Sequence, residues 1–222
     1  MVEIGSASRL SRAGTNGILF DVASERFDEV LQQRLWAVNK ALAGSPLVRE
    51  SVPGMNNLLV LYDSSRVEPQ QIEDVLQTLW HTTQPDPLIG RDVDVPVVYG
   101  GDFGEDLPAL SEHTGLSIEK VIELHSEATY CVSSIGAMPG FTYLSGLPPE
   151  LAWARRSVPR MQVRKGAIII GGSQAGIMPS TAPSGWHVIG HTEIGLFDPM
   201  NTPPNRFQLG DRIHFRVSGV QS

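Results

Sequence analysis

The sequence predicts an α+β protein, in which a small unit of strand-helix-strand-strand-helix-strand order precedes a turn-rich β-barrel or sandwich. In the first half, two amphipathic helical stripes alternate with short runs of β-forming residues. The second half, the 95 residues from Ala128 onward, holds 12 of the 22 glycines and 9 of the 16 prolines. No helical stripe of useful length is interleaved with them, which is typical of short strands joined by turns.

The first strand is expected at residues 17–22, a short apolar run, and a helix follows it. Ser24 is the predicted N-cap, and Gly44 lies just past the end of the helix. Apolar residues recur along one helical face: Phe27, Val30, Leu31, Leu35, Val38 and Leu42. Residues 47–52 and 58–62 then form a predicted hairpin, because a Pro-Gly-Met-Asn turn signal separates them.

A second helix and a last strand complete the first unit. Pro69 suits a first helical turn, and Ile72, Val75, Leu76 and Leu79 follow at helical spacing. Residues 93–98 alternate as a strand does, and Pro96 indicates a sheet edge or strand end. The resulting βαββαβ order is ferredoxin-like, and it places the first domain at residues 1–99.

Residues 100–127 are predicted to form a helical connection between the two domains. Its helices are expected at 107–113 and 118–125, with Gly115 as a C-terminal cap of the first and Ser117 as an N-cap of the second. His125 shares a face with apolar residues of the second helix. Without other information, a partly buried structural histidine is the favoured interpretation.

The second domain, residues 128–222, is predicted to be a compact barrel or sandwich. Its candidate strands are 129–135, 167–170, 186–190, 195–197 and 212–217. The loop from Gly136 to Pro148 is rich in glycine and also carries Pro139, Gly140, Phe141 and Tyr143. These residues are suited to line a pocket, although a tight barrel corner with its aromatic rings in the core is the favoured alternative.

Other candidate motifs are weaker. The glycine-rich run from Gly172 to Gly176 lacks the ending of a phosphate loop, so a β-turn is favoured, although Gln174 could hydrogen-bond an amide. In a strand, His187 and His191 would lie roughly 13 Å apart, too far to share a metal ion. Asp198 precedes a proline and is interpreted first as a turn residue and second as a catalytic carboxylate.

Composition excludes several classes of function. The net charge of −7, without a basic cluster, disfavours nucleic acid as a partner. Cys131 is the single cysteine, so no internal disulfide forms. The first residues lack the apolar segment of a secretory signal, and no apolar run reaches the ~20 residues that cross a bilayer. We therefore expect a cytoplasmic protein that binds no membrane.

An ordered series of motifs resembles one family, that of allophanate hydrolase subunit 1, also described as the B subunit of 5-oxoprolinase and as a sensor-kinase inhibitor. The resemblance covers nearly the whole chain. Its motifs are Tyr99 to Gly104, His125 to Tyr130, Gly136 to Leu147, Val158 to Arg160, Gly172 to Pro179, Pro183 to Trp186, Ile189 to Thr192 and Leu196 to Pro199.

This resemblance implies a ferredoxin-like unit followed by a cyclophilin-like barrel, and a subunit of a complex that hydrolyses 5-oxo-L-proline to L-glutamate at the expense of ATP. It also implies two partners: a homologue of allophanate hydrolase subunit 2, known as the C subunit of 5-oxoprolinase, and a lactam-utilisation-type protein. ATP with Mg is expected in the complex, with no tightly bound cofactor. Two alternatives remain, a non-catalytic inhibitor of a sensor histidine kinase and a subunit of a biotin-dependent carboxyltransferase of the urea or allophanate type.

As a hypothesis, the candidate catalytic residues are His125, Gln174, His191 and Asp198. The candidate substrate-binding residues are Pro139, Gly140, Phe141, Tyr143, Gly172 and Trp186. Opening a lactam at the expense of ATP suggests phosphorylation of its carbonyl oxygen. Positioned hydrogen-bond donors and cations are then needed to stabilise the charges that develop.

Five positions depart from the family pattern: Ala137, Ala175, Met178, Ser184 and His191 stand where phenylalanine, threonine, tyrosine, glycine and arginine are usual. The change at His191 removes a fixed cation and therefore points to a different ligand.

Overall fold

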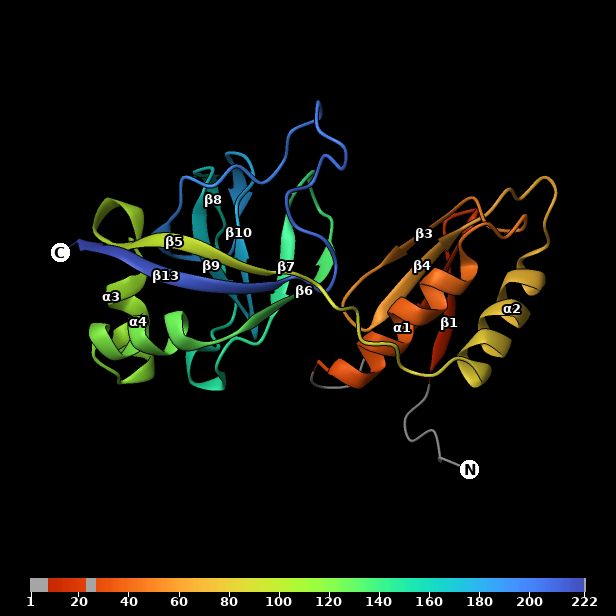
Figure 1. The fold of residues 1–222 in the computed structure, drawn as a ribbon, viewed down its shortest axis with the longest axis horizontal. Helices are drawn as coiled ribbons and strands as arrows, with labels where there is room; N and C mark the ends of the chain where they lie inside the picture. The colour runs from red at the N-terminus through yellow and green to blue at the C-terminus, as the bar shows by residue number, and fades with distance from the viewer. Residues whose placement is uncertain (1–7, 23–26, 222) are drawn as a thin grey trace. The chain divides into compact units, whose positions relative to one another are not determined.

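The chain, described by a computed structural model over residues 8–22 and 27–221, divides into two compact units, residues 1–88 and 89–222 (Figure 1). Each unit has its own hydrophobic core. The α+β class and the closed barrel that the sequence predicts are confirmed.

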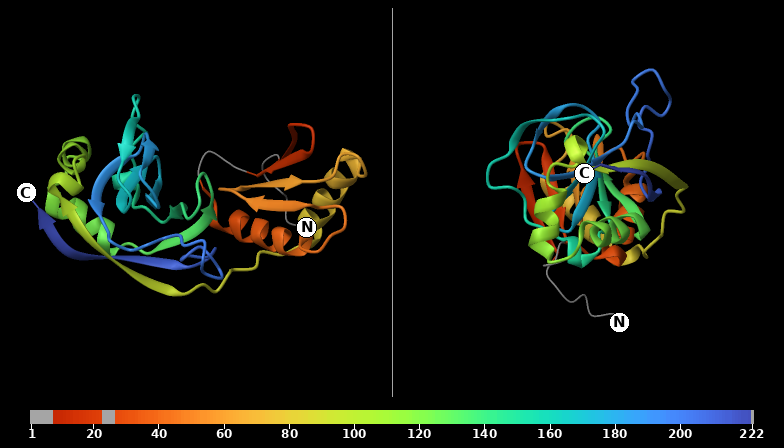
Figure 2. Two further views of the ribbon diagram at one scale, coloured as in Figure 1. Left: turned by 90° about the horizontal axis from the view of Figure 1, so that it is seen from above. Right: turned by 90° about the vertical axis from the view of Figure 1, so that its left-hand side faces the viewer.

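The first unit is a four-stranded antiparallel sheet with two helices against one face (Figure 2). Its elements are β1 (Arg9–Ala13), β2 (Gly17–Asp21), α1 (Glu29–Leu42), β3 (Glu50–Pro53), β4 (Asn57–Leu61) and α2 (Pro69–Thr82). Every second residue of β2 and β4 is buried, which is the period of a strand with one covered face. Leu35 and Val38 of α1 and Ile72 of α2 are fully buried against that face.

One predicted element of this unit belongs elsewhere. The sheet order is β1-β2-β4-β3, so the N-terminal strand β1 takes the edge position beside β2 that the sixth element of a βαββαβ unit would fill. The strand predicted at 93–98 is real, but as β5 (Asp92–Gly100) it pairs with strands of the second unit. The expected domain boundary at residue 99 therefore moves to residue 88. Backbone pairing assigns β5 to the second unit, and the sequence does not show that pairing.

The helix ends follow local chemistry. The predicted N-cap Ser24 lies outside the described residues, and Asp28 caps α1 by accepting a hydrogen bond from the Leu31 amide at 2.9 Å. In α2, Pro69 follows the N-cap Glu68, whose amide donates to the side chain of Gln71 at 2.9 Å.

The second unit is a closed barrel with strand order β10-β7-β6-β13-β5-β12-β9. Its long strands β5 and β13 (Arg212–Gln221) run parallel and lie side by side in Figure 1 and in the left view of Figure 2. The remaining barrel strands are β6 (Tyr130–Ile135), β7 (Thr142–Ser145), β9 (Ala167–Gly171), β10 (Gln174–Ile177) and β12 (His187–His191). A separate two-stranded sheet joins β8 (Arg160–Val163) to β11 (Ala182–Ser184).

Two helices belong to this second unit rather than to a separate connection. They are α3 (Leu107–Thr114) and α4 (Ile118–Glu127), and single 3-10 turns stand at η1 (Gly101–Phe103) and η2 (Pro149–Leu151). Gly115 caps α3 with a left-handed φ of 70°, and the Ser117 side chain caps α4, both as predicted. The strand expected at 195–197 is absent as an element; Phe197 makes only an isolated bridge with Asn205.

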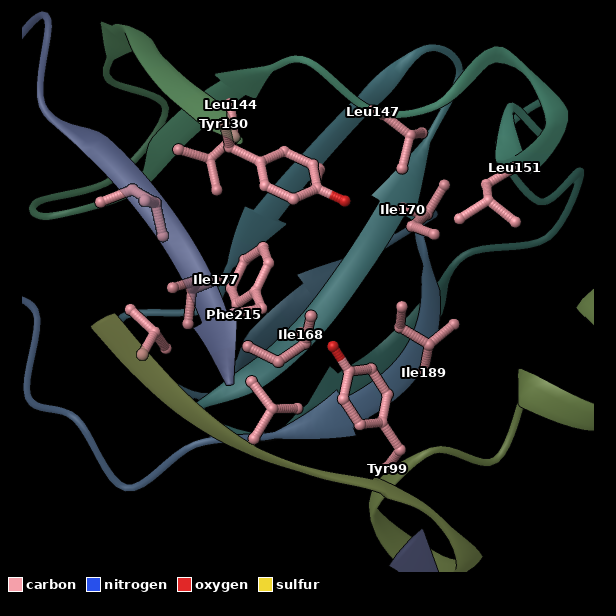
Figure 3. Packing of buried hydrophobic residues seen from close by; sticks show 14 of the residues in the cluster. Tyr99, Tyr130, Leu144, Leu147, Leu151, Ile168, Ile170, Ile177, Ile189 and Phe215 are labelled. Atoms are coloured by element: carbon pink, nitrogen blue, oxygen red, sulfur yellow. The ribbon is translucent and has the colours of Figure 1, made fainter. Parts of the chain in front are cut away.

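The barrel core is filled by branched and aromatic side chains (Figure 3). Strand β9 is buried along its whole length, so both of its faces are covered. Ile168 and Ile170 face the barrel interior, whereas Ala167 and Ile169 belong to a smaller cluster that contains Trp186. Because side chains alternate between the two faces of a strand, the outer face of β9 packs against a second apolar layer outside the barrel.

Candidate functional site

A pocket of about 300 Å³ lies over this second apolar layer, and we call it the aromatic pocket. The ring of Phe141 packs edge-on against that of Tyr143, with centroids 4.9 Å apart, and against that of Trp186 at 5.8 Å. Met138 and Met178 extend the apolar lining. The structure thus brings together three of the predicted substrate-binding residues, which lie up to 45 positions apart in the chain.

Glycines make room for the largest of these rings. A Cβ atom on Gly171 would lie 2.4 Å from the indole of Trp186, and one on Gly176 would lie 3.2 Å from Phe141. The glycine-rich run therefore serves close packing of the aromatic wall. Its turn residue Gly172 has a φ of +66°, as expected in a tight β-hairpin, and its amide donates to the Trp153 carbonyl, outside the hairpin, at 2.7 Å.

Two arginines and no acidic residue line the same pocket within residues 8–22 and 27–221. The guanidinium of Arg155 lies 5.5 Å from the centroid of the Trp186 ring, a cation-π distance. Arg156 instead turns to Asp106, with Nη1 3.1 Å from the carboxylate. The pocket therefore combines an apolar wall with positive charge, in a chain whose net charge is −7.

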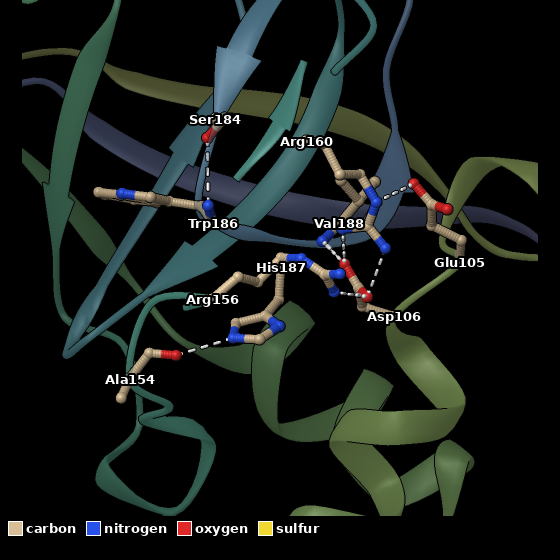
Figure 4. A network of polar contacts seen from close by, with 9 residues as sticks. All are labelled: Glu105, Asp106, Ala154, Arg156, Arg160, Ser184, Trp186, His187 and Val188. Carbon is tan, nitrogen blue, oxygen red and sulfur yellow. Dashed lines mark hydrogen bonds and ion pairs between the residues drawn. The ribbon is translucent and has the colours of Figure 1, made fainter. Parts of the chain in front are cut away.

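Asp106 is the centre of a buried polar network that holds this side of the pocket (Figure 4). Its carboxylate accepts two hydrogen bonds from Arg160, both at 2.7 Å, and one from the Val188 amide at 2.7 Å, besides the one from Arg156. Burial opposes ionisation of this carboxyl group, but the hydrogen bonds and the two guanidinium charges outweigh it and lower the pKa of Asp106. Arg156 and Arg160 are thereby fixed by one residue from the start of α3.

A larger cavity in the first unit lacks these features. Its volume is about 730 Å³, and more than half of its lining residues are polar, among them Arg49, Asp63 and Arg66. Because ligand sites are usually concave, apolar and marked by a few convergent polar groups, the aromatic pocket is the better candidate despite its smaller volume.

Residues 8–207 match the family described as "Carboxyltransferase domain, subdomain C and D". The chain belongs to this family. It is 40% identical to a protein from Escherichia coli O157:H7 named as the B subunit of 5-oxoprolinase, over 83% of this chain and 84% of that protein. A Bacillus subtilis protein of the same name is 34% identical over 87% of this chain and 88% of its own length.

Solved structures share the fold. The structure of TTHA0988 has a TM-score of 0.76 at 30% identity and covers 93% of this chain, which spans only 40% of that longer chain. The K. lactis urea amidolyase has a TM-score of 0.83 at 16% identity; it covers 95% of this chain, which corresponds to 15% of the amidolyase. At that identity the likeness shows the fold alone.

Against this family background, the remaining candidate residues do not gather at the aromatic pocket. Gly140 is buried with a φ of +82°, and a Cβ there would lie 2.7 Å from the Cβ of Phe197, so its role is close packing of the loop. Pro139 is exposed beside it. Gln174 is half-buried at the start of β10 and pairs with Gly171; neither Gly172 nor Gln174 lines the pocket.

His125 does not fit the catalytic role predicted for it. It is fully buried, and its ring stacks on Phe215 with centroids 4.7 Å apart. Nδ1 lies 2.8 Å from the hydroxyl of Tyr99, and Tyr130 donates to its backbone carbonyl at 3.1 Å. Burial lowers the pKa of His125 to about 3, so the ring stays neutral at physiological pH. It is a structural residue of the barrel core, as its position on the apolar face of α4 indicates.

His191 and Asp198 lie outside the aromatic pocket. His191 donates from Nε2 to the Lys165 carbonyl at 3.0 Å and stacks on Phe103, in a separate cavity of about 380 Å³. Asp198 is exposed and accepts hydrogen bonds from the Met200 amide at 2.9 Å and the Asn201 side chain at 3.2 Å, which is the geometry of an Asx-turn. The turn interpretation of Asp198 therefore accounts for its contacts.

Three of the five departures from the family pattern, Ala137, Met178 and Ser184, line the aromatic pocket, whereas Ala175 and His191 do not. Sequence reasoning missed Arg155, Arg156 and Asp106. Of the residues in this network, the sequence singled out only Arg160, as the last residue of the Val-Pro-Arg motif. The others were missed because charges in a segment without regular structure do not reveal which partner they will contact.

Within residues 8–22 and 27–221, no group of three or more His, Cys, Asp or Glu side chains could hold a metal ion. None of the helices described is both long and apolar enough to cross a bilayer.

Proposed function

We propose that this chain is the B subunit of an ATP-dependent 5-oxoprolinase complex and that the aromatic pocket receives the cyclic amide. The observation that carries the proposal is the 34–40% identity, over 83–87% of the chain, to three proteins that bear this subunit's name. The partners would be a homologue of allophanate hydrolase subunit 2 and a lactam-utilisation-type protein, in a cytoplasmic complex.

The pocket suits a small lactam. Its volume of about 300 Å³ lies at the lower end of ligand pockets, which run roughly from 300 to 1,000 Å³. The rings of Phe141 and Trp186 offer apolar surface to a five-membered ring, and the Tyr143 hydroxyl supplies a hydrogen-bond donor for the lactam carbonyl. Holding the amide in one orientation is the contribution that such a site makes to catalysis.

ATP does not fit this chain's glycine-rich turn. The Gly172 amide is already bonded to Trp153, and the Gln174 and Gly171 backbones pair with each other in the β-ladder. A phosphate cradle needs free backbone donors, and the donors of this turn are already used. We therefore place ATP and its Mg elsewhere in the complex than at this turn.

The two alternative functions receive less support. The three named relatives share the oxoprolinase name. The likeness to urea amidolyase, at 16% identity, concerns the fold. A kinase inhibitor would act without the other two proteins, so the same experiment separates it from the enzyme.

The test is to co-express the chain with its partner subunits and to measure glutamate release from 5-oxoproline with and without ATP. We expect ATP-dependent release that disappears when this chain is omitted. In the complete complex, Tyr143→Phe should lower kcat/KM by about ten-fold, the effect of losing one hydrogen bond to the reacting group. Tyr130→Phe is the matched control: it removes a buried hydroxyl that donates to the His125 carbonyl, away from the pocket, and should leave kcat/KM unchanged. No release from a folded complex would refute the proposal.

A further inference from the structure

The segment that carries Arg155 is anchored on both sides. Trp153 and Gly172 exchange backbone hydrogen bonds of 3.1 and 2.7 Å. The Ala154 carbonyl accepts from His187 Nε2 at 2.8 Å, and the Arg156 amide donates to the Gly185 carbonyl at 2.7 Å. Because its neighbours on both sides are fixed, the backbone of Arg155 is fixed too, although its side chain is exposed.

Each neighbouring side chain has a structural partner. Trp153 stacks on His187 with ring centroids 3.7 Å apart, and Arg156 is bound to Asp106. Over the residues that the structure describes, Arg155 forms no ion pair within 4.0 Å; its guanidinium lies over the ring of Trp186. A rigid segment therefore presents one uncompensated cation at the aromatic pocket.

The charge of this cation is not offset by the pocket itself. Among the described residues that line the pocket there is no aspartate or glutamate, and the second lining cation, Arg156, is paired with Asp106. A guanidinium at a cation-π distance from an indole still has N–H groups to donate, and these match the two oxygens of a carboxylate. The pocket thus complements an anionic group next to a small apolar ring.

We propose that Arg155 is a specificity-determining residue that binds the carboxylate of the ring substrate, while the ring lies against Trp186 and Phe141. This inference rests on the proposed function and deepens it: the pocket selects cyclic amides that carry a carboxylate beside the ring nitrogen over the same ring without one. Its contribution is to binding and orientation, since the guanidinium does not contact the amide that reacts.

The test compares Arg155→Gln and Arg155→Lys in the complete complex, with Arg216→Gln as the control. Arg216 is an exposed arginine of the same unit, on β13, and pairs with Asp94. We expect KM for 5-oxoproline to rise about ten-fold or more in Arg155→Gln with kcat within a few-fold, because one charge-assisted pair is lost. Lysine should restore part of the loss, and Arg216→Gln should change nothing.

The second measurement uses 2-pyrrolidinone, the same ring without the carboxylate, as a competitive inhibitor. Its inhibition constant should be equal in the unaltered complex and in Arg155→Gln, because it has no carboxylate to bind. A KM for 5-oxoproline that stays within two-fold in Arg155→Gln would overturn the inference while glutamate release still supports the enzyme. An equal loss of affinity for both compounds would also overturn it, because the variant would then have damaged the pocket as a whole.

If the complex releases no glutamate, the proposed function fails, and the inference is decided by binding to the full chain alone. Trp186 supplies a fluorescence signal in the pocket, with Trp186→Phe to identify it. Quenching by 5-oxoproline but not by 2-pyrrolidinone, lost in Arg155→Gln, would support carboxylate recognition. Equal response to both compounds, or response to neither, would reject it.

Discussion

Acid should destabilise the barrel unit through His125. Burial lowers the pKa of this ring to about 3 in the folded protein, whereas an unfolded chain binds the proton with a pKa of about 6.5. Below pH 6.5 the unfolded state therefore binds more protons than the folded state, so the free energy of unfolding falls as pH falls. The slope is about 1.4 kcal/mol per pH unit, which amounts to about 2 kcal/mol between pH 6.5 and 5. Above pH 6.5 this contribution is fully present.

The assay is urea unfolding at pH 7.5, 6.5, 5.8 and 5, followed by tryptophan fluorescence. Trp36 and Trp80 lie in the first unit, so changing both to phenylalanine confines the signal to Trp153 and Trp186 of the barrel unit. The chosen window stays above the range where the carboxyl groups become protonated. Any change between pH 6.5 and 5 therefore reports histidines.

His125→Phe should lower stability at pH 7.5, because the buried Tyr99 hydroxyl loses its partner at a cost of about 1–3 kcal/mol. The same variant should lose most of the pH slope below 6.5. His113→Phe is the matched control: His113 is exposed, stacks on Trp153 and should keep the slope. An unchanged slope in His125→Phe would refute the argument that burial of this ring produces the acid sensitivity.

Two further predictions concern the supports of the aromatic pocket. Asp106→Asn should cost about 1–3 kcal/mol, because Arg156 loses its carboxylate partner, whereas Arg160 keeps Glu105 at 2.9 Å; thermal unfolding of the barrel unit measures the loss. Gly171→Ala should cost about 1–3 kcal/mol and change the fluorescence of Trp186, since the new Cβ would lie 2.4 Å from the indole. Gly195→Ala, where nothing lies within 4 Å of the new Cβ, should leave both stability and fluorescence unchanged.

The sequence by itself determined the class of the fold and most of its elements. The stripes that predict α1 and α2 are local patterns with helical period, and their buried members, among them Leu35, Val38, Ile72 and Leu76, face the core. The caps at Gly115 and Ser117 were equally predictable, since a cap depends on residues within one turn. The motifs also identified the family and three residues of the pocket wall.

Only the tertiary structure decided which sheet each strand joins and which charges meet. Strand β5 has the pattern of a last strand of the first unit, yet it forms hydrogen bonds with β13, more than 110 residues later. Asp106 binds Arg160, which is 54 positions later in the chain, and Arg155 contacts Trp186, which is 31 positions later. The position of His125 on an apolar helix face predicted a buried residue. Its contacts with Tyr99 of β5 and Phe215 of β13, which the sequence does not show, place its ring in the barrel core rather than in a site. Such pairings bring together distant parts of the chain, and local periodicity holds no information about partners that far away.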